Sequence, residues 1–310
     1  MNRKIIIGTR GSELALWQAN HVKASLETRF PDLTFEIRTI KTTGDRILDT
    51  ALSKIGDKGL FTKEIESALM SGEIDLAIHS LKDLPTTLPD GLSIGAVTSR
   101  EIPHDVLISK NARSISALPG DARVATGSLR RKSQLLNLRP DIEVSDIRGN
   151  VPTRIEKFLA SDLDAMILAF AGMHRLGLDE HIAQVIPVSE MIPAVGQGAI
   201  AVEARATDGE VLDLANKIND ADTELCITAE RAFLRELEGG CQVPIGAHAV
   251  CVDGGVRLDG FVGSLDGSNV IRETITGVPE EAVSIGQRLA AICIDRGASE
   301  ILLEARSEGD

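Results

Sequence analysis

The sequence comprises 310 residues with 43% hydrophobic and 25% charged side chains and a mean hydropathy of +0.05. These values are typical of a folded protein of two or three domains, and they exclude extended disorder and a small disulfide-stapled scaffold. The 46 acidic and 33 basic residues give a net charge of −13, and there is one Trp and no Tyr. Nucleic acid is therefore a disfavoured partner, because the charge repels phosphates and few rings are available for base stacking.

The sequence carries no signal for export or membrane insertion. Only three isoleucines precede Gly8, and the longest apolar stretch, Ala165–Met173, has nine residues, about half of what a membrane span needs. We therefore expect a cytoplasmic protein without a membrane partner. The four cysteines form no C-x-x-C pair, and the six histidines are not spaced like zinc ligands. We expect neither structural disulfides nor a metal site.

The first hundred residues alternate between strand and helix patterns. Lys4–Thr9 is an apolar, β-branched run that predicts a strand, and a glycine turn leads from it into a helix with Ser12 as N-cap that ends before Pro31. The same patterns predict three more elements: a strand at Phe35–Ile40, a helix at Thr62–Met70 and a strand at Leu76–Ser80.

A second α/β unit repeats this order. Arg123–Thr126 predicts a strand, and Leu129–Leu138 predicts a helix that begins after the Gly127 turn. Further elements are predicted at Ile142–Ile147 (strand), Thr153–Ala160 (helix) and Ala165–Phe170 (strand). Ala199–Glu203 predicts a single strand that returns to the first unit. The alternation favours two α/β lobes.

The pattern changes near Asp222 to a helix that ends at Gly239, followed by three alternating strands and a last helix between Pro279 and Gly297. The strands are predicted at Ile245–Val252, Val256–Val262 and Asn269–Thr276. This tail predicts a small α+β domain. We expect domains at 1–98 with 199–216, at 104–192, and at 221–310.

Basic residues gather between Arg123 and Lys157, where eight basic side chains stand against four acidic ones. Arginine predominates, and its planar fork binds carboxylate or phosphate in a bidentate manner. Gly127 and Ser128 at a helix N-terminus add unpaired N–H groups that favour anions. The pattern indicates a site for a small molecule with several anionic groups, and a solvated helix face is the alternative.

Charged residues also follow the predicted strand Leu76–Ser80, at the edge where α/β sheets bind ligands. Asp83 is a candidate for acid–base work or for stabilising a cation, with a capping aspartate as the alternative. His79 lies within the strand pattern, and we expect a hydrogen-bonded histidine of the interior there instead of a metal ligand.

Cys241 lies in a glycine turn between a helix and the three-stranded region, where a cysteine is suited to covalent chemistry but is also often inert. The other three cysteines (Cys226, Cys251 and Cys293) fall in predicted helices or strands, and we expect them in the core. Leu52–Phe61 predicts a mobile loop, either a lid over a cleft or an ordinary surface loop.

Eight stretches together resemble the porphobilinogen deaminase family, whose members are also called hydroxymethylbilane synthases. Each stretch alone has low specificity, but all eight occur in the family's order over nearly the whole chain. They are Gly8–Ala19, Thr43–Asp49, Gly59–Glu64, His79–Asp83, Gly127–Arg131, Arg148–Asn150, Pro193–Gly198 and Glu238–Pro244.

The resemblance implies two lobes like those of type II periplasmic binding proteins around a cleft, with a small domain that carries a cofactor. It further implies that Cys241 holds a dipyrromethane through a thioether and that four porphobilinogens extend this primer, each losing ammonia, before water releases hydroxymethylbilane. A monomeric transferase of haem and tetrapyrrole biosynthesis is the implied protein. Thr43 and His174 depart from the pattern that we expect in many relatives, which leaves their contribution to substrate contacts open.

The resemblance also implies roles for individual residues. Asp83, Lys82 and Arg10 would form the catalytic set. The cofactor contacts would be Cys241, Ser80, Lys82, Asp83, Thr126, Ser128, Arg130, Arg131, Arg148 and Gly149. The substrate contacts would be Arg10, Ser12, Arg148, Arg154, Arg175 and Gln197.

Two other classes of function remain open from the residues alone. One is a non-catalytic cytoplasmic protein that binds a polycarboxylate, and the other is a different cysteine-dependent enzyme acting on polycarboxylates. Both predict an unmodified thiol at Cys241, whereas the deaminase hypothesis predicts a stable adduct.

Overall fold

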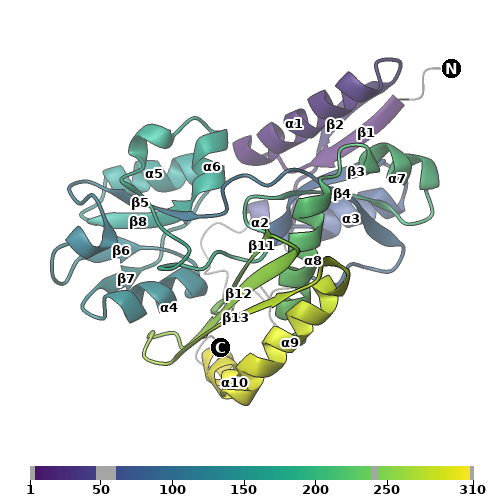
Figure 1. The fold of residues 1–310 in the computed structure, drawn as a ribbon. Coiled ribbons are helices and arrows are strands. Elements are labelled where there is room, and N and C mark those ends of the chain that lie inside the picture. Colours follow the sequence, from purple (N-terminus) through teal and green to yellow (C-terminus); the bar gives the residue numbers. More distant parts are fainter. Residues whose placement is uncertain (1–3, 47–60, 239–242, 308–310) are drawn as a thin grey trace. The chain divides into compact units, whose positions relative to one another are not determined.

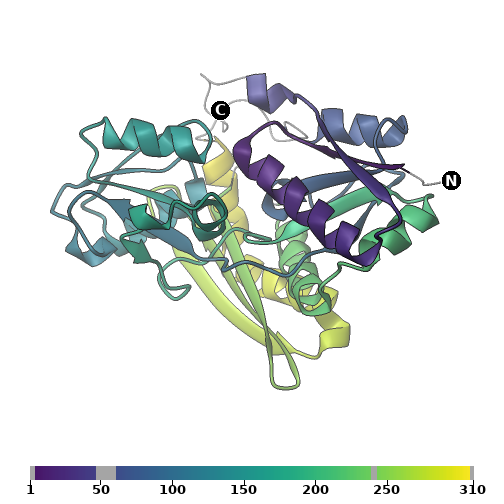
Figure 2. The same cartoon turned by 90° about the horizontal axis from the view of Figure 1, so that it is seen from above.

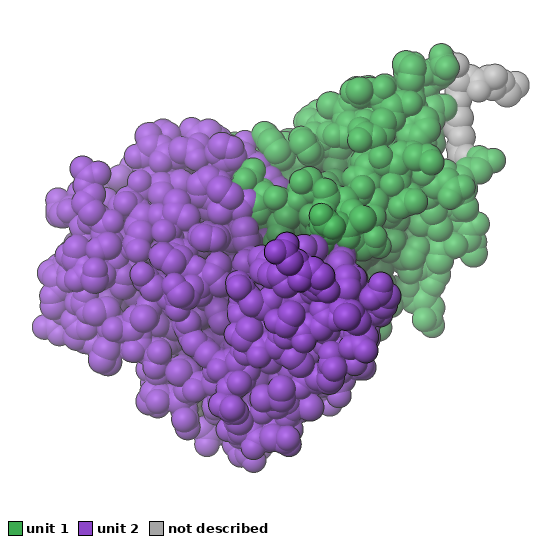
Figure 3. All heavy atoms as spheres, in the orientation of Figure 1, with its two compact units in different colours: residues 1–48, 58–101, 198–224 green, residues 49–57, 102–197, 225–310 purple. Residues whose placement is uncertain are grey.

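The computed structural model describes residues 4–46, 61–238 and 243–307. The chain divides into two compact units, coloured separately in Figure 3. Unit 1 comprises residues 1–48, 58–101 and 198–224, and unit 2 comprises residues 49–57, 102–197 and 225–310. Within the described residues, no helix is both long and apolar enough to cross a membrane.

Unit 1 is built on a five-stranded sheet with the strand order β2-β1-β3-β10-β4. Its strands are β1 (Lys4–Thr9), β2 (Thr34–Thr39), β3 (Leu76–Ser80), β4 (Leu92–Val97) and β10 (Ile200–Arg205). The first three are parallel, whereas β10 runs antiparallel between β3 and β4, with Ile200 opposite Ser80. The strand predicted near residue 200 therefore does return to the first unit.

The helices of unit 1 cover both faces of this sheet. They are α1 (Glu13–Arg29), α2 (Thr43–Arg46), α3 (Lys63–Met70) and α7 (Gly209–Asn216), together with a single 3₁₀ turn at Leu81–Asp83. The Ser12 hydroxyl caps α1 by accepting a hydrogen bond from the amide of Ala15, as predicted. Leu26 and Val22 of α1 are completely buried against the sheet, where Figures 1 and 2 show the helix lying along it.

Unit 2 contains a second five-stranded sheet with the order β7-β6-β8-β5-β9. Its strands are β5 (Asp105–Ser109), β6 (Arg123–Ala125), β7 (Glu143–Ser145), β8 (Ala165–Ala169) and β9 (Gln184–Val185), and its helices are α4 (Leu129–Leu138), α5 (Val151–Leu159) and α6 (Phe170–Arg175). Strands β6, β7 and β8 are parallel, and β5 is antiparallel to β8. Ser128 and Asn150 cap α4 and α5.

The C-terminal part of unit 2 is an antiparallel three-stranded sheet with two helices after it. Its elements are β11 (Ile245–Val252), β12 (Gly255–Gly263), β13 (Val270–Gly277), α9 (Ala282–Asp295) and α10 (Ala298–Ser307), and α8 (Ala221–Glu236) precedes them. Helix α9 approaches α8 closely at Gly286, where a Cβ atom would stand 2.4 Å from the carbonyl oxygen of Ala229. The expected fold class, two α/β lobes followed by a small α+β domain, is confirmed.

Several elements were not predicted from the sequence: β4, β5, β9, α2, α6, α7 and α10. One expectation about the core is wrong. Cys251 is exposed, because it lies near the end of β11 where the strand leaves the core, whereas Cys226 and Cys293 are buried as expected.

Candidate functional site

Polar residues collect in each unit at the edge where the parallel strands end, called here the carboxyl edge. In unit 1, β1 leads to Arg10 and Ser12, and β3 leads to Ser80, Lys82 and Asp83. Because β1 and β3 are adjacent and parallel, these side chains meet at one edge of the sheet. The resemblance assigned all five of them to the site.

A pocket opens at this edge of unit 1 and encloses about 420 Å³, part of it open to solvent. Its lining includes Arg10 and Ser12 before α1, Phe61 before α3, and Ser80 and Asp83 after β3. The N-terminus of α1 contributes its positive end to the pocket. The pocket therefore combines a cation, a carboxylate and hydroxyl groups, a set suited to a ligand that carries both acidic groups and N–H donors.

Arg10 is held between a carboxylate and an aromatic ring. Its Nη2 lies 2.6 Å from Oδ1 of Asp45, and its guanidinium carbon lies 4.2 Å from the centre of the Phe61 ring. Gly44 makes room for that ring, since a Cβ atom there would stand 2.2 Å from it. Burial raises the pKa of Asp45, but hydrogen bonds from Arg10 and Thr42 outweigh burial and hold the pKa below its usual value. The site thus has a fixed guanidinium with a charged partner.

Asp83 is an exposed carboxylate at the end of the 3₁₀ turn and lines the pocket. The N-cap of this turn is Ser80, so the structure does not favour a capping aspartate at position 83. Ser80 is itself fixed, because its hydroxyl accepts a 2.8 Å hydrogen bond from the side-chain amide of Gln18. Lys82 is half-buried in the same turn. The pocket therefore has a solvent-exposed carboxylate, Asp83, close to a Ser80 side chain that is held in place by a hydrogen bond.

His79 precedes this turn in β3 and also lines the pocket. Its Nε2 lies 3.0 Å from Oε2 of Glu203 in β10, and their side chains are 4% and 0% exposed. The sequence predicted an interior histidine with a hydrogen-bond partner, and the structure confirms it. Glu203 itself was not singled out, since it lies 124 residues away in the chain.

Unit 2 gathers a second set of predicted residues at its carboxyl edge. Thr126 and Ser128 follow β6, and the Thr126 hydroxyl accepts a 3.3 Å hydrogen bond from the amide of Ser128. Gly149 lies between β7 and α5 with a φ of +126°, and a Cβ atom there would stand 2.8 Å from Cγ2 of Thr153, so only glycine fits. The other predicted residues of this edge are Arg148 and Arg154, which are partly buried, and Arg175, which is buried.

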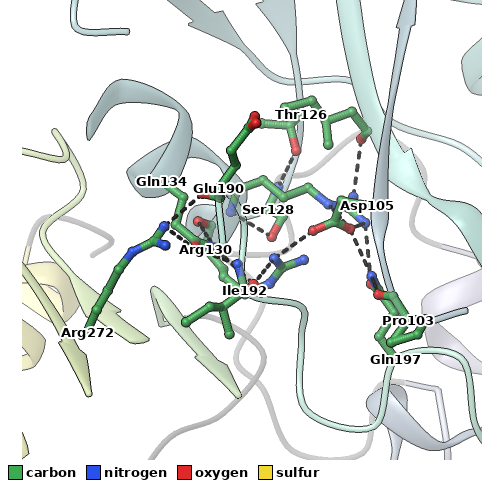
Figure 4. A network of polar contacts seen from close by, with 12 residues as sticks. Pro103, Asp105, Thr126, Ser128, Arg130, Gln134, Glu190, Ile192, Gln197 and Arg272 are labelled. Atoms are coloured by element: carbon green, nitrogen blue, oxygen red, sulfur yellow. Dashed lines mark hydrogen bonds and ion pairs between the residues drawn. The ribbon is translucent and has the colours of Figure 1, made fainter. Parts of the chain in front are cut away.

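Asp105 is the centre of a buried polar network in unit 2, shown in Figure 4. Its carboxylate accepts from Nη1 of Arg130 at 2.7 Å, from Nη2 and Nε of Arg131 at 2.7 and 3.0 Å, and from Nε2 of Gln197 at 2.9 Å. Burial acts to raise the pKa of Asp105, but the two guanidiniums overcome it and hold the pKa far below its usual range. The network has two cations and one anion.

Two of the predicted anion-binding residues, Arg130 and Arg131, are buried and belong to this network. Arg130 and Arg131 are 4% and 6% exposed, so they do not form a solvated helix face. They also form ion pairs with Asp105, which no local pattern in the sequence indicates because it lies 25 and 26 residues earlier in the chain. One positive charge remains in excess. Nε of Arg130 is buried and has no partner among the described residues.

The network continues from α4 to the three-stranded sheet. Gln134 of α4 donates to the carbonyl oxygen of Ile192 at 3.0 Å and accepts from Nη2 of Arg272 in β13 at the same distance. Arg272 also donates to the carbonyl oxygen of Glu190 at 2.8 Å, as Figure 4 shows. The arginine-bearing helix is therefore fixed to the C-terminal sheet of its own unit.

The residues of this edge are suited to an acidic organic group. They combine an excess guanidinium, a buried Nε without a described partner, and two capped helix N-termini at Ser128 and Asn150. A group bearing several carboxylates fits this chemistry. Cys241 and most of the Leu52–Phe61 loop lie outside the described residues.

Two family models match the chain: "Porphobilinogen deaminase, dipyromethane cofactor binding domain" over residues 5–213 and "Porphobilinogen deaminase, C-terminal domain" over residues 224–294. The chain belongs to the porphobilinogen deaminase family. Curated porphobilinogen deaminases from Chlorobium phaeobacteroides (strain BS1) and Chloroherpeton thalassium are 53% and 54% identical to it, each with 99% of both chains covered. The one from Pelotomaculum thermopropionicum is 52% identical at the same coverage.

Solved structures show more distant similarity. The methionine binding protein MetQ is 12% identical with a TM-score of 0.44, covering 69% of this chain and 89% of that one. YtmK of Bacillus subtilis, a probable amino-acid transporter binding protein, is 13% identical with the same TM-score, covering 70% and 90%.

Proposed function

We propose that this member of the porphobilinogen deaminase family condenses four porphobilinogen molecules, with loss of four ammonia molecules, and releases linear hydroxymethylbilane by hydrolysis. The observation that carries the proposal is the unit 1 pocket, in which the exposed carboxylate of Asp83 lies in a wall that also presents Arg10 and the N-terminus of α1. Porphobilinogen has a pyrrole N–H and two carboxylates, so this set complements it.

Asp83 would stabilise positive charge as ammonia leaves. Departure of the amine spreads positive charge onto the pyrrole nitrogen, and a fixed carboxylate near that N–H stabilises the transition state more than the ground state. Arg10, which Asp45 and Phe61 hold in place, would bind a substrate carboxylate without needing to be ordered first.

The arginines at the two carboxyl edges would bind the side-chain carboxylates of the pyrrole rings. Each added ring brings two more carboxylates, so a growing chain of rings needs many guanidiniums. The substrate contacts would be Arg10, Ser12, Arg148, Arg154, Arg175 and Gln197. For Gln197 the role would be indirect in part, since its side-chain amide already donates to Asp105.

A dipyrromethane held by a thioether to Cys241 would supply the ring carbon to which the first substrate is joined. The carboxylates of this group would be bound by eight residues: Ser80, Lys82, Thr126, Ser128, Arg130, Arg131, Arg148 and, through its amide, Gly149. Asp83 would accept hydrogen bonds from the pyrrole N–H groups. We further propose a monomer with three domains, at 1–98 with 199–216, 104–192 and 221–310. The third would be the one that carries the cofactor.

The test is the intact mass of the purified protein together with its turnover of porphobilinogen. The wild type should carry an adduct of two pyrrole rings on Cys241 and release ammonia and hydroxymethylbilane. Cys241→Ser should lack the adduct, whereas Cys251→Ser, which changes an exposed cysteine, should keep it. A wild-type protein with an unmodified Cys241 that consumes no porphobilinogen would instead support a binding protein for a polycarboxylate.

A further inference from the structure

Three ionisable side chains are buried together on the face of the unit 1 sheet that packs against α3. In the antiparallel pairing of β3 and β10, Glu203 lies opposite Ala77, two residues from His79, so both side chains point to the same face. Glu66 of α3 is 8% exposed, and its burial, together with the charge of Glu203, raises its pKa. The proposed function assigns no role to these three residues.

The hydrogen bond to Glu203 determines what His79 offers to the pocket. A carboxylate only accepts, so Nε2 of His79 carries the proton of this 3.0 Å bond and Nδ1 keeps a lone pair. Because Nε2 is engaged in the interior, Nδ1 is the ring nitrogen available to a molecule in the pocket that His79 lines. A carboxylate–imidazole pair of this kind fixes the tautomer and the direction of a base.

We propose that His79 is the proton acceptor of this site and that Glu203 is the positioning residue that orients it. This inference rests on the proposed function and deepens it. In each condensation, the C–N bond to the amine breaks and its electron pair leaves with nitrogen, and a ring carbon forms the new C–C bond. That ring carbon then loses a proton, whose bonding electrons restore the aromatic ring. The amine is lost from its ammonium form and therefore leaves as neutral ammonia. Nδ1 of His79 takes the ring proton and passes it to this ammonia, which is released as ammonium.

The other charged groups near His79 are less suited to this task. Asp83 would lose the charge that stabilises the cation if it took up the proton. Arg10 at the end of β1 is permanently protonated and bound to Asp45. Glu66 on α3 and Glu203 on β10 are not among the described residues that line the pocket. Uptake of the proton by His79 creates an imidazolium next to the buried carboxylate of Glu203, so the new positive charge is balanced where it forms. Oε1 of Glu203 has no hydrogen-bond partner among the described residues.

The first test compares three variants with the wild type. His79→Gln keeps a donor for Glu203 but cannot accept the proton, Glu203→Gln keeps the size but removes the charge, and His21→Gln changes an exposed histidine on α1 of the same unit. At saturating porphobilinogen we expect His79→Gln to lower kcat by about 10²-fold or more with little change in KM, because general-base catalysis contributes ~10²–10⁴-fold. Glu203→Gln should lower kcat less, and His21→Gln should not change it.

Substrate deuterated at its free ring carbon separates a base from a purely structural residue. Slower proton removal in His79→Gln should produce an isotope effect on kcat larger than that of the wild type. A folded His79→Gln variant with the wild-type kcat and isotope effect would overturn the inference while leaving the deaminase function intact. Failure of the wild type to consume porphobilinogen would instead overturn the proposed function.

A second readout does not depend on turnover or on the folding of a variant. In ¹⁵N-histidine-labelled wild-type protein, the ring nitrogens of His79, assigned through bonds to the backbone of β3, should show a protonated Nε2 and an unprotonated Nδ1 near neutral pH. A proton on Nδ1 alone would contradict the inference, because the nitrogen to which the proton transfer is assigned would then be unable to accept one.

Discussion

Replacing Asp105 by asparagine tests the interpretation of the unit 2 network. The carboxylate is fully buried, accepts four hydrogen bonds of 2.7–3.0 Å, and is the counter-ion of two buried arginine side chains, Arg130 and Arg131. Asparagine has nearly the same shape, but it leaves both cations without a counter-charge and turns an NH₂ group toward donors. Removing one partner of a buried ion pair costs about 3–5 kcal/mol of unfolding free energy.

This cost predicts a measurable fall in the melting temperature. With an unfolding entropy of ~2.1 cal/mol/K per residue, a chain of 310 residues gives about 0.65 kcal/mol per kelvin and a fall of about 5–8 °C for Asp105→Asn. Asp141→Asn is the matched control, since Asp141 also accepts two arginine hydrogen bonds, at 2.6 and 2.7 Å, but is exposed. Its variant should melt close to the wild type. If both variants shift equally in calorimetry, the network does not stabilise unit 2 as argued.

Three further predictions concern the same carboxyl edge. Because the pKa of Asp105 is depressed in the folded protein, the stabilisation by its carboxylate is complete above the unfolded carboxyl pKa of ~3.9 and is lost as the pH falls toward the folded pKa. The difference in melting temperature between the wild type and Asp105→Asn should therefore be constant from pH 7 to 5 and should become smaller below about pH 4. Arg131→Lys keeps the charge but loses the paired hydrogen bonds of Nε and Nη2 to Asp105, so porphobilinogen turnover should fall by about 10–100-fold. Normal turnover and normal cofactor content in this variant would show that Arg131 does not contribute to the site. Gly149→Ala should lower the free energy of unfolding in denaturant by about 1–3 kcal/mol, because the φ of this residue is +126°. Gly120→Ala, with nothing within 4 Å of the added Cβ, should lower it little, and equal losses of unfolding free energy in both variants would show that the strain argument is wrong.

The fold was predicted from the sequence where a local pattern is strong. The run Lys4–Thr9 with its glycine turn, the capped helices after Ser12 and Ser128, and the three-stranded meander all carry such patterns, and all are present. Strand β5 was missed because four of its five residues are buried in succession, without alternation, and its partners β8 and β9 come more than 50 residues later. A short buried strand cannot be distinguished by periodicity alone.

The site could be predicted only as far as its residues lie near one another in the chain. The arginines after Gly127 were found because they follow a strand end, but their counter-ion Asp105 belongs to a strand that reaches the same edge by running antiparallel. Glu203 reaches His79 in the same way, through β10. Both missed residues are carboxylates on antiparallel strands, and pairing at such distances leaves no signal in the local sequence.

The central claim is that the fixed carboxylate of Asp83 stabilises the cation formed as ammonia leaves. The most direct measurement is single-turnover release of ammonia from porphobilinogen by cofactor-loaded wild type, Asp83→Asn and Asp83→Glu. Loss of ~3–4 kcal/mol of charge stabilisation predicts a rate about 10²–10³-fold lower for Asp83→Asn, whereas Asp83→Glu, whose charge is displaced by one methylene, should retain a small rate above that of the amide. Ammonia release by Asp83→Asn at the wild-type rate would contradict the account.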